Sequence, residues 1–240
     1  FRILFKLDLA KPHYFGLRDT LLSPLGLLRG EKQVSRQGLK WKLDLQDWIQ
    51  SQIYYLGEYY TERNHLNAWL SLIKPGNYII DIGANIGYYS YIAAHAGIEK
   101  IVAFEFMREY ADFTASNFKR ENISGVVVNK GVGNPKDVGI YADPLANVKG
   151  ELISLDEYAK ANNIWPDIVK MDIEGFELDA LKNCHEILLK GPALDISIHD
   201  KFLEDRGQSE REVLELLRSY GYKTIWKGGG TFLMVVHDIY

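Results

Sequence analysis

The chain has 240 residues, of which 47% are hydrophobic and 25% charged, an ordinary composition for a globular protein with a sizeable buried core. Its formal net charge of −4 argues against a nucleic-acid partner, because such proteins usually present a strongly basic face. The single cysteine, Cys184, excludes an internal disulfide, and no apolar stretch reaches the roughly 18 residues that span a bilayer. We therefore expect a cytoplasmic protein without a membrane span.

The first 45 residues are predicted to form an arm, and residues 46–240 a single domain. The arm is rich in glycine and proline and shows no sustained apolar periodicity, which is typical of short helices and turns. A capped helix is expected next. Asp44 is a good capping residue, Asp47 lies three positions further on, and Gly57 ends the apolar pattern.

From residue 78 onward, short apolar runs alternate with segments of helical periodicity. Such alternation with short links predicts a mostly parallel sheet covered by helices on both faces. The last two strands are separated only by three glycines, residues 228–230, so they should form an antiparallel hairpin. The expected strands lie near 78–82, 101–106, 126–129, 167–172, 193–199, 222–226 and 232–237. The expected helices lie near 61–73, 86–96, 109–121, 155–162, 174–189 and 209–220.

The segment Asp81–Gly87, with the sequence DIGANIG, joins the first of these strands to a helix through an acidic turn. Gly83 and Gly87 would let the backbone approach a ligand closely. The start of the following helix offers unpaired N–H groups to a negative group. Asp81 adds a negative charge at the end of the strand, which suits a cationic ligand or an ammonium group.

This turn differs from the dinucleotide-binding fingerprint. Asn85 stands in the place of the second glycine and Tyr88 in the place of the third, and a carboxylate at Asp81 would repel a pyrophosphate. S-adenosylmethionine carries a sulfonium, an ammonium and a carboxylate but no phosphate. The turn therefore fits S-adenosylmethionine better than a nicotinamide dinucleotide.

A second acid, Glu105, lies at the end of the next apolar strand, about 20 residues after the glycine turn. In mononucleotide-binding folds an acid at this point meets the ribose, whose hydroxyls can donate hydrogen bonds to a carboxylate. Phe106 could cover one face of the adenine, whereas Phe104 is expected in the core.

Two later strand ends carry polar groups that suit chemistry on an acceptor. Asp172 and Glu174 follow the apolar run that begins at Ile168, and His199 ends the run that begins at Ala193. If these two strands are neighbours, Asp172 and His199 come within about 5–8 Å of each other. Such a pair could orient a hydroxyl or remove its proton.

Other interpretations of these residues remain open. Asp172 could be a helix N-cap, Glu174 an ordinary residue of a helix N-terminus, and His199 a structural histidine. Together with Asp200, the three could bind a divalent cation, although no H-x-x-H or E-x-x-H pattern supports one. Direct base catalysis without a metal is the preferred hypothesis.

Four segments together point to a known family: Asp81–Gly87, Phe104-Glu105, Leu155–Tyr158 and Asp167–Gly175. With these motifs the chain resembles the FkbM family of S-adenosylmethionine-dependent methyltransferases, from about Gly57 to the C-terminus. Ser197 is a departure, because the family commonly shows an acid two residues before the histidine. The resemblance implies an α/β, Rossmann-like class I methyltransferase fold: a seven-stranded, mostly parallel sheet with an antiparallel C-terminal hairpin and an N-terminal helical extension.

We therefore expect a methyltransferase that acts on a hydroxyl of a sugar or glycoconjugate. An oxygen acceptor is favoured because the Asp/Asn-Pro-Pro-aromatic motif expected for amino groups of bases is absent. A nicotinamide-dependent oxidoreductase and a catalytically inactive binding module on the same fold remain the alternatives. The residues expected at the cofactor are Asp81, Gly83, Asn85, Gly87, Glu105, Phe106 and Asp172. The residues expected in catalysis are Asp172, His199 and Glu174. Aromatic residues that could form a carbohydrate-facing lid are Trp41, Trp48, Tyr54, Tyr55, Tyr59 and Tyr60, although Trp48 is rather expected in the core.

Overall fold

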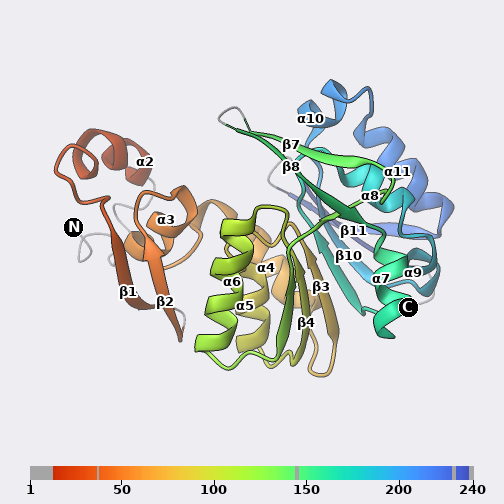
Figure 1. Ribbon diagram of the computed structural model, residues 1–240, viewed down its shortest axis with the longest axis horizontal. Helices are drawn as coiled ribbons and strands as arrows, with labels where there is room; N and C mark the ends of the chain where they lie inside the picture. The colour runs from red at the N-terminus through yellow and green to blue at the C-terminus, as the bar shows by residue number, and fades with distance from the viewer. Residues whose placement is uncertain (1–12, 37, 144–145, 229–230, 238–240) are drawn as a thin grey trace. The chain divides into compact units, whose positions relative to one another are not determined.

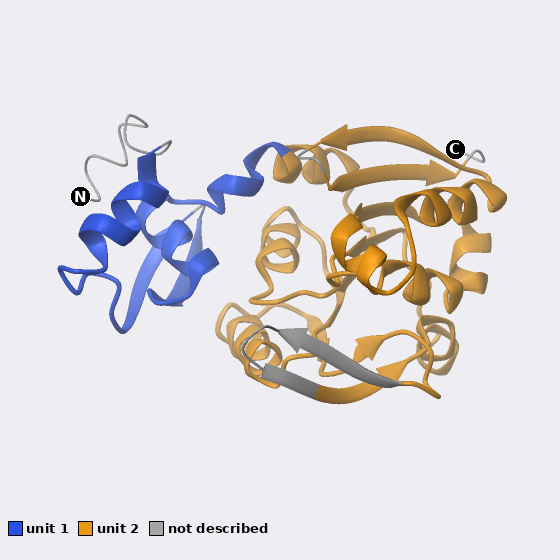
Figure 2. Ribbon diagram, turned by 90° about the horizontal axis from the view of Figure 1, so that it is seen from above, with its two compact units in different colours: residues 1–64 blue, residues 65–240 orange. Residues whose placement is uncertain are grey.

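The computed structural model describes residues 13–36, 38–143, 146–228 and 231–237 (Figure 1). The chain forms two compact units, residues 1–64 and residues 65–240 (Figure 2). The boundary expected from the sequence, between residues 45 and 46, falls inside the first unit. Within the part of the chain that the structure describes, no helix combines the length and the apolarity that a membrane span requires.

The second unit is built on a seven-stranded sheet with the order β11-β12-β10-β9-β3-β4-β5. The strands from β10 to β5 are parallel, and β12 runs antiparallel to both β10 and β11. All seven expected strands and the C-terminal hairpin are thus confirmed. Their bounds are β3 Tyr78–Ile82, β4 Lys100–Phe104, β5 Gly125–Val128, β9 Ile168–Met171, β10 Ala193–Ser197, β11 Tyr222–Gly228 and β12 Phe232–His237.

Helices cover both faces of this sheet (Figure 1). One face carries α4 (Arg63–Leu72), α5 (Tyr88–His95) and α6 (Arg108–Arg120). The other face carries α7 (Leu155–Asn162), α8 (Glu177–Lys182), α9 (His185–Lys190) and α11 (Glu210–Ser219). The inner parallel strands β3, β4, β9 and β10 are buried on both sides, which explains why they appear in the sequence as short, nearly continuous apolar runs.

The helix expected over 174–189 is wrong, because two short helices, α8 and α9, occupy this range. The second helix begins at His185, where its free N–H groups find an acceptor outside the segment. The carboxylate of Asp156 on α7 accepts from the backbone N–H groups of Glu186 (2.9 Å) and Ile187 (3.0 Å). This cap comes from a distant part of the chain, so local periodicity could not reveal the break.

Four further elements of this unit were not expected. The strands β6 (Gly131–Val132), β7 (Val138–Asp143) and β8 (Ala146–Ile153) form a small separate sheet between β5 and α7, in the order β6-β8-β7. The helix α10 (Asp200–Asp205) follows β10. Because β10 ends at Ser197, His199 lies beyond the strand and at the start of α10 rather than at the strand's last position.

The first unit contains α2 (Tyr14–Leu17), a π-helix η2 (Arg18–Leu22), α3 (Trp48–Leu56) and a 3-10 helix η3 (Tyr60–Glu62). It also contains an antiparallel hairpin of β1 (Glu31–Arg36) and β2 (Leu39–Asp44), which the sequence pattern did not predict. The residues of β1 are mostly exposed and polar, so this strand lacks the apolar alternation that marks a buried one.

Three expectations for the first unit are corrected. Asp47, not Asp44, caps α3, since its side chain accepts from the backbone N–H of Gln50 at 2.8 Å. Asp44 is instead the last residue of β2. Trp48 was expected in the core but is 43% exposed, whereas Trp41, expected at a lid, is buried.

The two faces of the central sheet differ in chemistry. Ile80 of β3 and Val169 of β9 belong to the apolar core beneath α7, α8, α9 and α11. The neighbouring residues point to the opposite face, since side chains alternate along a strand. There Asp81, Lys170 and Asp195 are direct register partners across β3, β9 and β10, and all three are buried. A charged row therefore crosses the middle of the sheet.

Candidate active site

The glycine turn after β3 is packed against the protein's own backbone. Gly83 has φ 79°, and a Cβ atom there would lie 1.9 Å from the backbone oxygen of Asp172. Gly87 has φ 75°, and a Cβ atom there would lie 2.6 Å from Cγ2 of Thr114 on α6. Both positions require glycine, because a side chain would be strained and would displace a neighbour. The sequence predicted that the backbone at these glycines approaches a ligand closely. In the structure the same backbone lies against the loop after β9 and against α6.

Glu105 ties this turn to the loop after β4. Its Oε2 accepts from the backbone N–H of Asn85 at 2.6 Å, and its Oε1 accepts from the N–H of Met107 at 2.7 Å. Burial raises the pKa of Glu105, and these two hydrogen bonds oppose the rise. Asn85 adopts a left-handed conformation (φ 51°), and its side chain accepts from the N–H of Ile86 at 2.7 Å. A carboxylate offers about four lone-pair sites, so Glu105 keeps acceptor capacity for a ligand.

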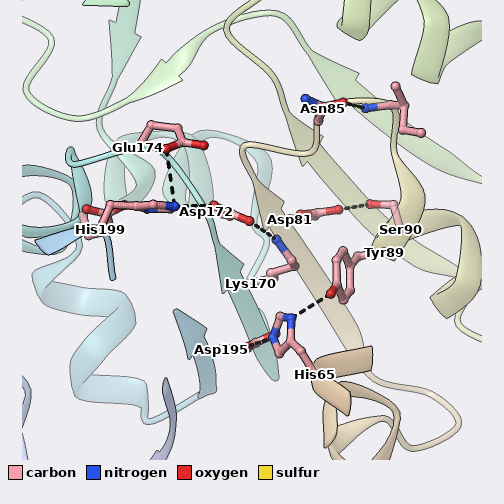
Figure 3. Close-up of polar contacts among 12 residues, drawn as sticks. His65, Asp81, Asn85, Tyr89, Ser90, Lys170, Asp172, Glu174, Asp195 and His199 are labelled. Carbon is pink, nitrogen blue, oxygen red and sulfur yellow. Dashed lines mark hydrogen bonds and ion pairs between the residues drawn. The ribbon is translucent and has the colours of Figure 1, made fainter. Parts of the chain in front are cut away.

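Asp81 is a buried carboxylate with one unsatisfied oxygen. Its Oδ2 accepts from the hydroxyl of Ser90 at 2.7 Å, whereas its Oδ1 is buried with no hydrogen-bond partner among the described residues (Figure 3). Burial raises the pKa of Asp81, and the charge of Lys170 opposes the rise. An unpaired buried acceptor is uncommon in folded proteins and suits a donor group supplied by a ligand or a bound water.

Phe106 packs on the small sheet that follows β5. Its ring lies so close to Gly131 of β6 and Gly150 of β8 that Cβ atoms there would come within 3.0 Å and 2.6 Å of it. The side chain of Asn129 donates to the backbone oxygens of Glu105 and Phe106, both at 2.9 Å. The loop that carries the two expected cofactor residues is therefore held by Asn129, just after β5, and by β6 and β8.

Lys170 links the charged row to the next loop. Its Nζ lies 3.4 Å from Oδ2 of Asp172 and 4.5 Å from the centre of the Tyr89 ring, and the residue is only 3% exposed (Figure 3). Asp81 and Asp195 flank it in register on either side. A buried ammonium group requires such partners, because an isolated charge in the interior is strongly disfavoured.

His65 of α4 extends this network from the face of the sheet that carries α4, α5 and α6. Its Nε2 lies 2.8 Å and 2.9 Å from the two carboxylate oxygens of Asp195, and its Nδ1 lies 2.7 Å from the hydroxyl of Tyr89 (Figure 3). The ring of Phe232 stacks on it with centroids 3.7 Å apart. The sequence analysis missed this network. A lysine inside a run expected to be a buried strand was the signal that could have revealed it.

The second group of expected residues meets around His199. Its Nε2 lies 3.7 Å from Oδ1 of Asp172 and 3.4 Å from Oε2 of Glu174, so the proximity expected for neighbouring strands is observed (Figure 3). Its Nδ1 lies 3.0 Å from Oε1 of Glu177, a fully buried residue that the sequence analysis missed. Glu174 adopts a left-handed backbone conformation (φ 54°), which turns its side chain back toward the histidine.

Opposing influences act on the ionisation of this cluster. Burial alone would lower the pKa of His199, but the hydrogen bond to Glu177 and the charges of Glu174 and Asp172 outweigh it and raise the pKa to about 9. Burial also raises the pKa of Glu174, against the favourable charge of His199. Asp200, weighed as a fourth member, is exposed on α10 and does not belong to the convergent group.

The arrangement has two halves at one edge of the sheet. The loops after β3 and β4 place Asp81, Asn85 and Glu105 around the glycine turn, and the loops after β9 and β10 place Asp172 and His199 together. Ligands of open α/β sheets bind beyond the carboxyl ends of the strands. The first half could hold a nucleoside-bearing cofactor and the second could position a reacting group or hold a metal ion.

Comparisons with known proteins agree with this arrangement. A family model described as "Methyltransferase FkbM domain" matches residues 81–224, which is more than half of the chain and includes both halves of the site. No curated protein sequence matches the chain.

Solved structures share the fold at low sequence identity. A methyltransferase FkbM from Methylobacillus flagellatus KT superposes with a TM-score of 0.53 at 16% identity, covering 75% of this chain and 53% of its own. This chain thus spans about half the length of that protein. A magnesium protoporphyrin IX methyltransferase from Synechocystis PCC 6803 with bound SAM gives 0.51 at 15% identity and 94% coverage of both chains. M. jannaschii TYW2 in complex with AdoMet gives 0.50 at 15% identity, covering 87% of this chain and 84% of its own.

Proposed function

Because this chain belongs to the FkbM family of methyltransferases, we propose that it transfers a methyl group from S-adenosylmethionine to a hydroxyl of a sugar or glycoconjugate. The observation that carries the proposal is the pairing of two sites along one sheet edge. An acid-lined glycine turn lies after β3 and β4, and a carboxylate–histidine cluster lies after β9 and β10. The first suits a cationic nucleoside, and the second suits an acceptor that must lose a proton.

The residues around the glycine turn fit the donor. Glu105 retains lone pairs for the ribose hydroxyls although it already accepts two backbone N–H groups. The unpaired Oδ1 of Asp81 suits a donor such as the ammonium of the methionine moiety, directly or through a water. Phe106 lies beside Glu105 and offers a ring for the adenine. Gly83, Asn85 and Gly87 shape the turn that these groups surround.

Bound S-adenosylmethionine supplies a methyl carbon that its positive sulfur has already activated. The contribution of the protein is then alignment of the acceptor oxygen and removal of its proton. The carboxylates of Asp172 and Glu174 can accept a hydrogen bond from the hydroxyl and receive the proton that the oxygen releases on methylation. His199, whose raised pKa of about 9 keeps it protonated near neutral pH, positions these carboxylates. Sugar hydroxyls are poor nucleophiles at neutral pH, so this help matters more for them than for amines.

Substitution of His199 tests the division into donor and acceptor halves. His199→Ala should bind S-adenosylhomocysteine with nearly wild-type affinity, because the ring lies with Asp172 and Glu174 and not at the glycine turn. The same variant should lose roughly 10²–10⁴ in the rate of methyl transfer, the usual contribution of a positioned acid or base. The measurement is titration calorimetry followed by transfer of labelled methyl to sugar nucleotides, free glycans and glycolipids.

Specific outcomes would contradict the proposal. Wild-type turnover by His199→Ala would remove the histidine from the acceptor half. Transfer only to protein or nucleic acid would overturn the sugar assignment. Tight binding of NAD without binding of S-adenosylhomocysteine would replace the methyltransferase with an oxidoreductase, and donor binding without transfer to any acceptor class would favour an inactive binding module.

A further inference from the structure

Three side chains of the acceptor half converge on one point. The ligand atoms of Asp172, Glu174 and His199 all lie within 4.8 Å of one another. The Nε2 atom of His199 is 3.7 Å and 3.4 Å from the two carboxylate oxygens, longer than the usual 2.7–3.2 Å of an N–H···O bond. Two ligands that share one metal ion at about 2.0–2.2 Å lie roughly 3.0–3.5 Å apart, so the two histidine–carboxylate distances need little or no contraction.

The second ring nitrogen of His199, Nδ1, already has the kind of partner that metal-binding histidines have. Oε1 of Glu177 lies 3.0 Å from Nδ1 of His199, and this fixes the ring with Nε2 directed at the cluster. A carboxylate on the second nitrogen is the usual partner of a metal-ligating imidazole. Oε2 of Glu177 is buried without a hydrogen-bond partner among the described residues, so a fully buried, incompletely satisfied anion adjoins the cluster.

The cluster contains more negative than positive side chains. Asp172, Glu174 and Glu177 lie within 4 Å of the imidazole, and the ammonium of Lys170 lies 3.4 Å from Asp172. Repulsion among three carboxylates in a partly buried site favours an added cation. Two carboxylates and one imidazole form an oxygen- and nitrogen-rich ligand set, which suits ions such as Mn²⁺, Mg²⁺ or Zn²⁺.

We propose that Asp172, Glu174 and His199 bind one divalent metal ion, and that the acceptor hydroxyl is held on this ion during methyl transfer. Three protein ligands leave coordination positions for water and for oxygen atoms of the acceptor. A hydroxyl bound to a divalent cation loses its proton to solvent water more readily, because the cation stabilises the alkoxide. The oxygen then forms a bond to the methyl carbon as the carbon–sulfur bond of the donor breaks, and S-adenosylhomocysteine leaves. This inference rests on the proposed function and replaces direct proton removal by the cluster with metal-assisted deprotonation.

Binding of Mn²⁺ alone to the purified full chain tests the site without cofactor or acceptor. After treatment with EDTA and removal of the chelator, the wild type should bind one Mn²⁺ per chain, measured by loss of the free-ion electron paramagnetic resonance signal. His199→Ala and Glu174→Gln should each weaken binding at least about tenfold, since even second-sphere changes cost 10–100-fold. Asp205→Asn is the matched control, an exposed acid on α10 outside the cluster, and should bind as the wild type does.

Because Glu174 is half-exposed, Glu174→Gln should fold as the wild type does, so this variant keeps the test valid if the His199→Ala protein fails to fold. Absence of Mn²⁺, Mg²⁺ and Zn²⁺ binding, or Mn²⁺ binding that both variants retain, would overturn the inference. Full methyl transfer by metal-free protein in EDTA would also overturn it. S-adenosylhomocysteine binding, measured in parallel, separates the two proposals. If the wild type does not bind S-adenosylhomocysteine, the methyltransferase proposal is contradicted, whereas the metal site is not.

Discussion

Replacing Lys170 by methionine tests whether the charged row across the sheet stabilises the domain. Methionine preserves most of the apolar stem but removes an ammonium that is 3% exposed. The ammonium lies 3.4 Å from the Asp172 carboxylate and is the register partner of Asp81 and Asp195. Breaking a buried ion pair from one side typically costs about 3–5 kcal/mol, because the remaining charge is left uncompensated.

One contact in the structure increases this expected loss of stability and another decreases it. The contact with the Tyr89 ring at 4.5 Å adds up to about 2 kcal/mol for a desolvated cation–π pair. Removal of the ammonium should destabilise the Asp195 carboxylate less than those of Asp81 and Asp172, because His65 already contacts both carboxylate oxygens of Asp195. We expect a loss of about 3–5 kcal/mol in the free energy of unfolding, against total stabilities of about 5–15 kcal/mol for typical domains.

Urea unfolding of wild type, Lys170→Met and the exposed control Lys201→Met measures the loss, with the control expected within about 0.5 kcal/mol of wild type. The pH dependence gives a second check. Burial raises the pKa of Asp81 and Lys170 opposes the rise, so removal of Lys170 should raise it further. A carboxyl group with a raised pKa in the folded state destabilises the fold when it is ionised. The deficit of the variant should therefore shrink as the pH falls from 8 toward 5.

A loss below about 1 kcal/mol with an unchanged denaturant slope would refute this reasoning, because it would mean that the three carboxylates do not depend on the ammonium. A deficit that grows as the pH falls would refute the assignment of the effect to unpaired carboxylates.

Two further predictions concern the cofactor half. Glu105→Ala should weaken S-adenosylhomocysteine binding by about 1.5–3 kcal/mol in calorimetry, the cost of charge-assisted hydrogen bonds to the ribose, and unchanged affinity in a folded variant would remove Glu105 from the site. Gly83→Ala places a Cβ atom 1.9 Å from the backbone oxygen of Asp172 and should abolish binding or folding. Gly76→Ala, with a similar φ of 86° and open space around it, is the control and should cost only about 1 kcal/mol; equal effects of the two in thermal unfolding would contradict the steric argument.

The centre of the sheet could be predicted because its inner strands β3, β4, β9 and β10 are buried on both faces and so form apolar runs that end in polar residues. The strand ends at Asp81, Glu105 and Asp172 follow directly from that pattern. The hairpin of β1 and β2 could not be predicted in the same way, because β1 is largely exposed and polar. The break between α8 and α9 depends on Asp156 of α7, which lies distant in the sequence. The residues around the break therefore do not reveal its cause.

The residues of the candidate site likewise fall into those that the sequence could predict and those that it could not. Residues that lie at strand ends were accessible to the sequence analysis because parallel strands bring their carboxyl ends together. Glu177 and His65 were not, since neither ends a strand and each acts through a partner that is distant in sequence. His199 lies two residues beyond β10 and reaches Asp172 only because β9 and β10 are neighbours.

Strand order also explains how the two halves of the site are joined. β9 lies between β3, which leads into the glycine turn, and β10, which leads to His199. Lys170 therefore has the buried Asp81 beside it on the donor side and contacts Asp172 on the acceptor side. A cation at this position balances carboxylates of both halves, so both can be held close together in a poorly solvated interior. The row of charge across β3, β9 and β10 is thus the structural reason that two acid-rich sites can share one edge of the sheet.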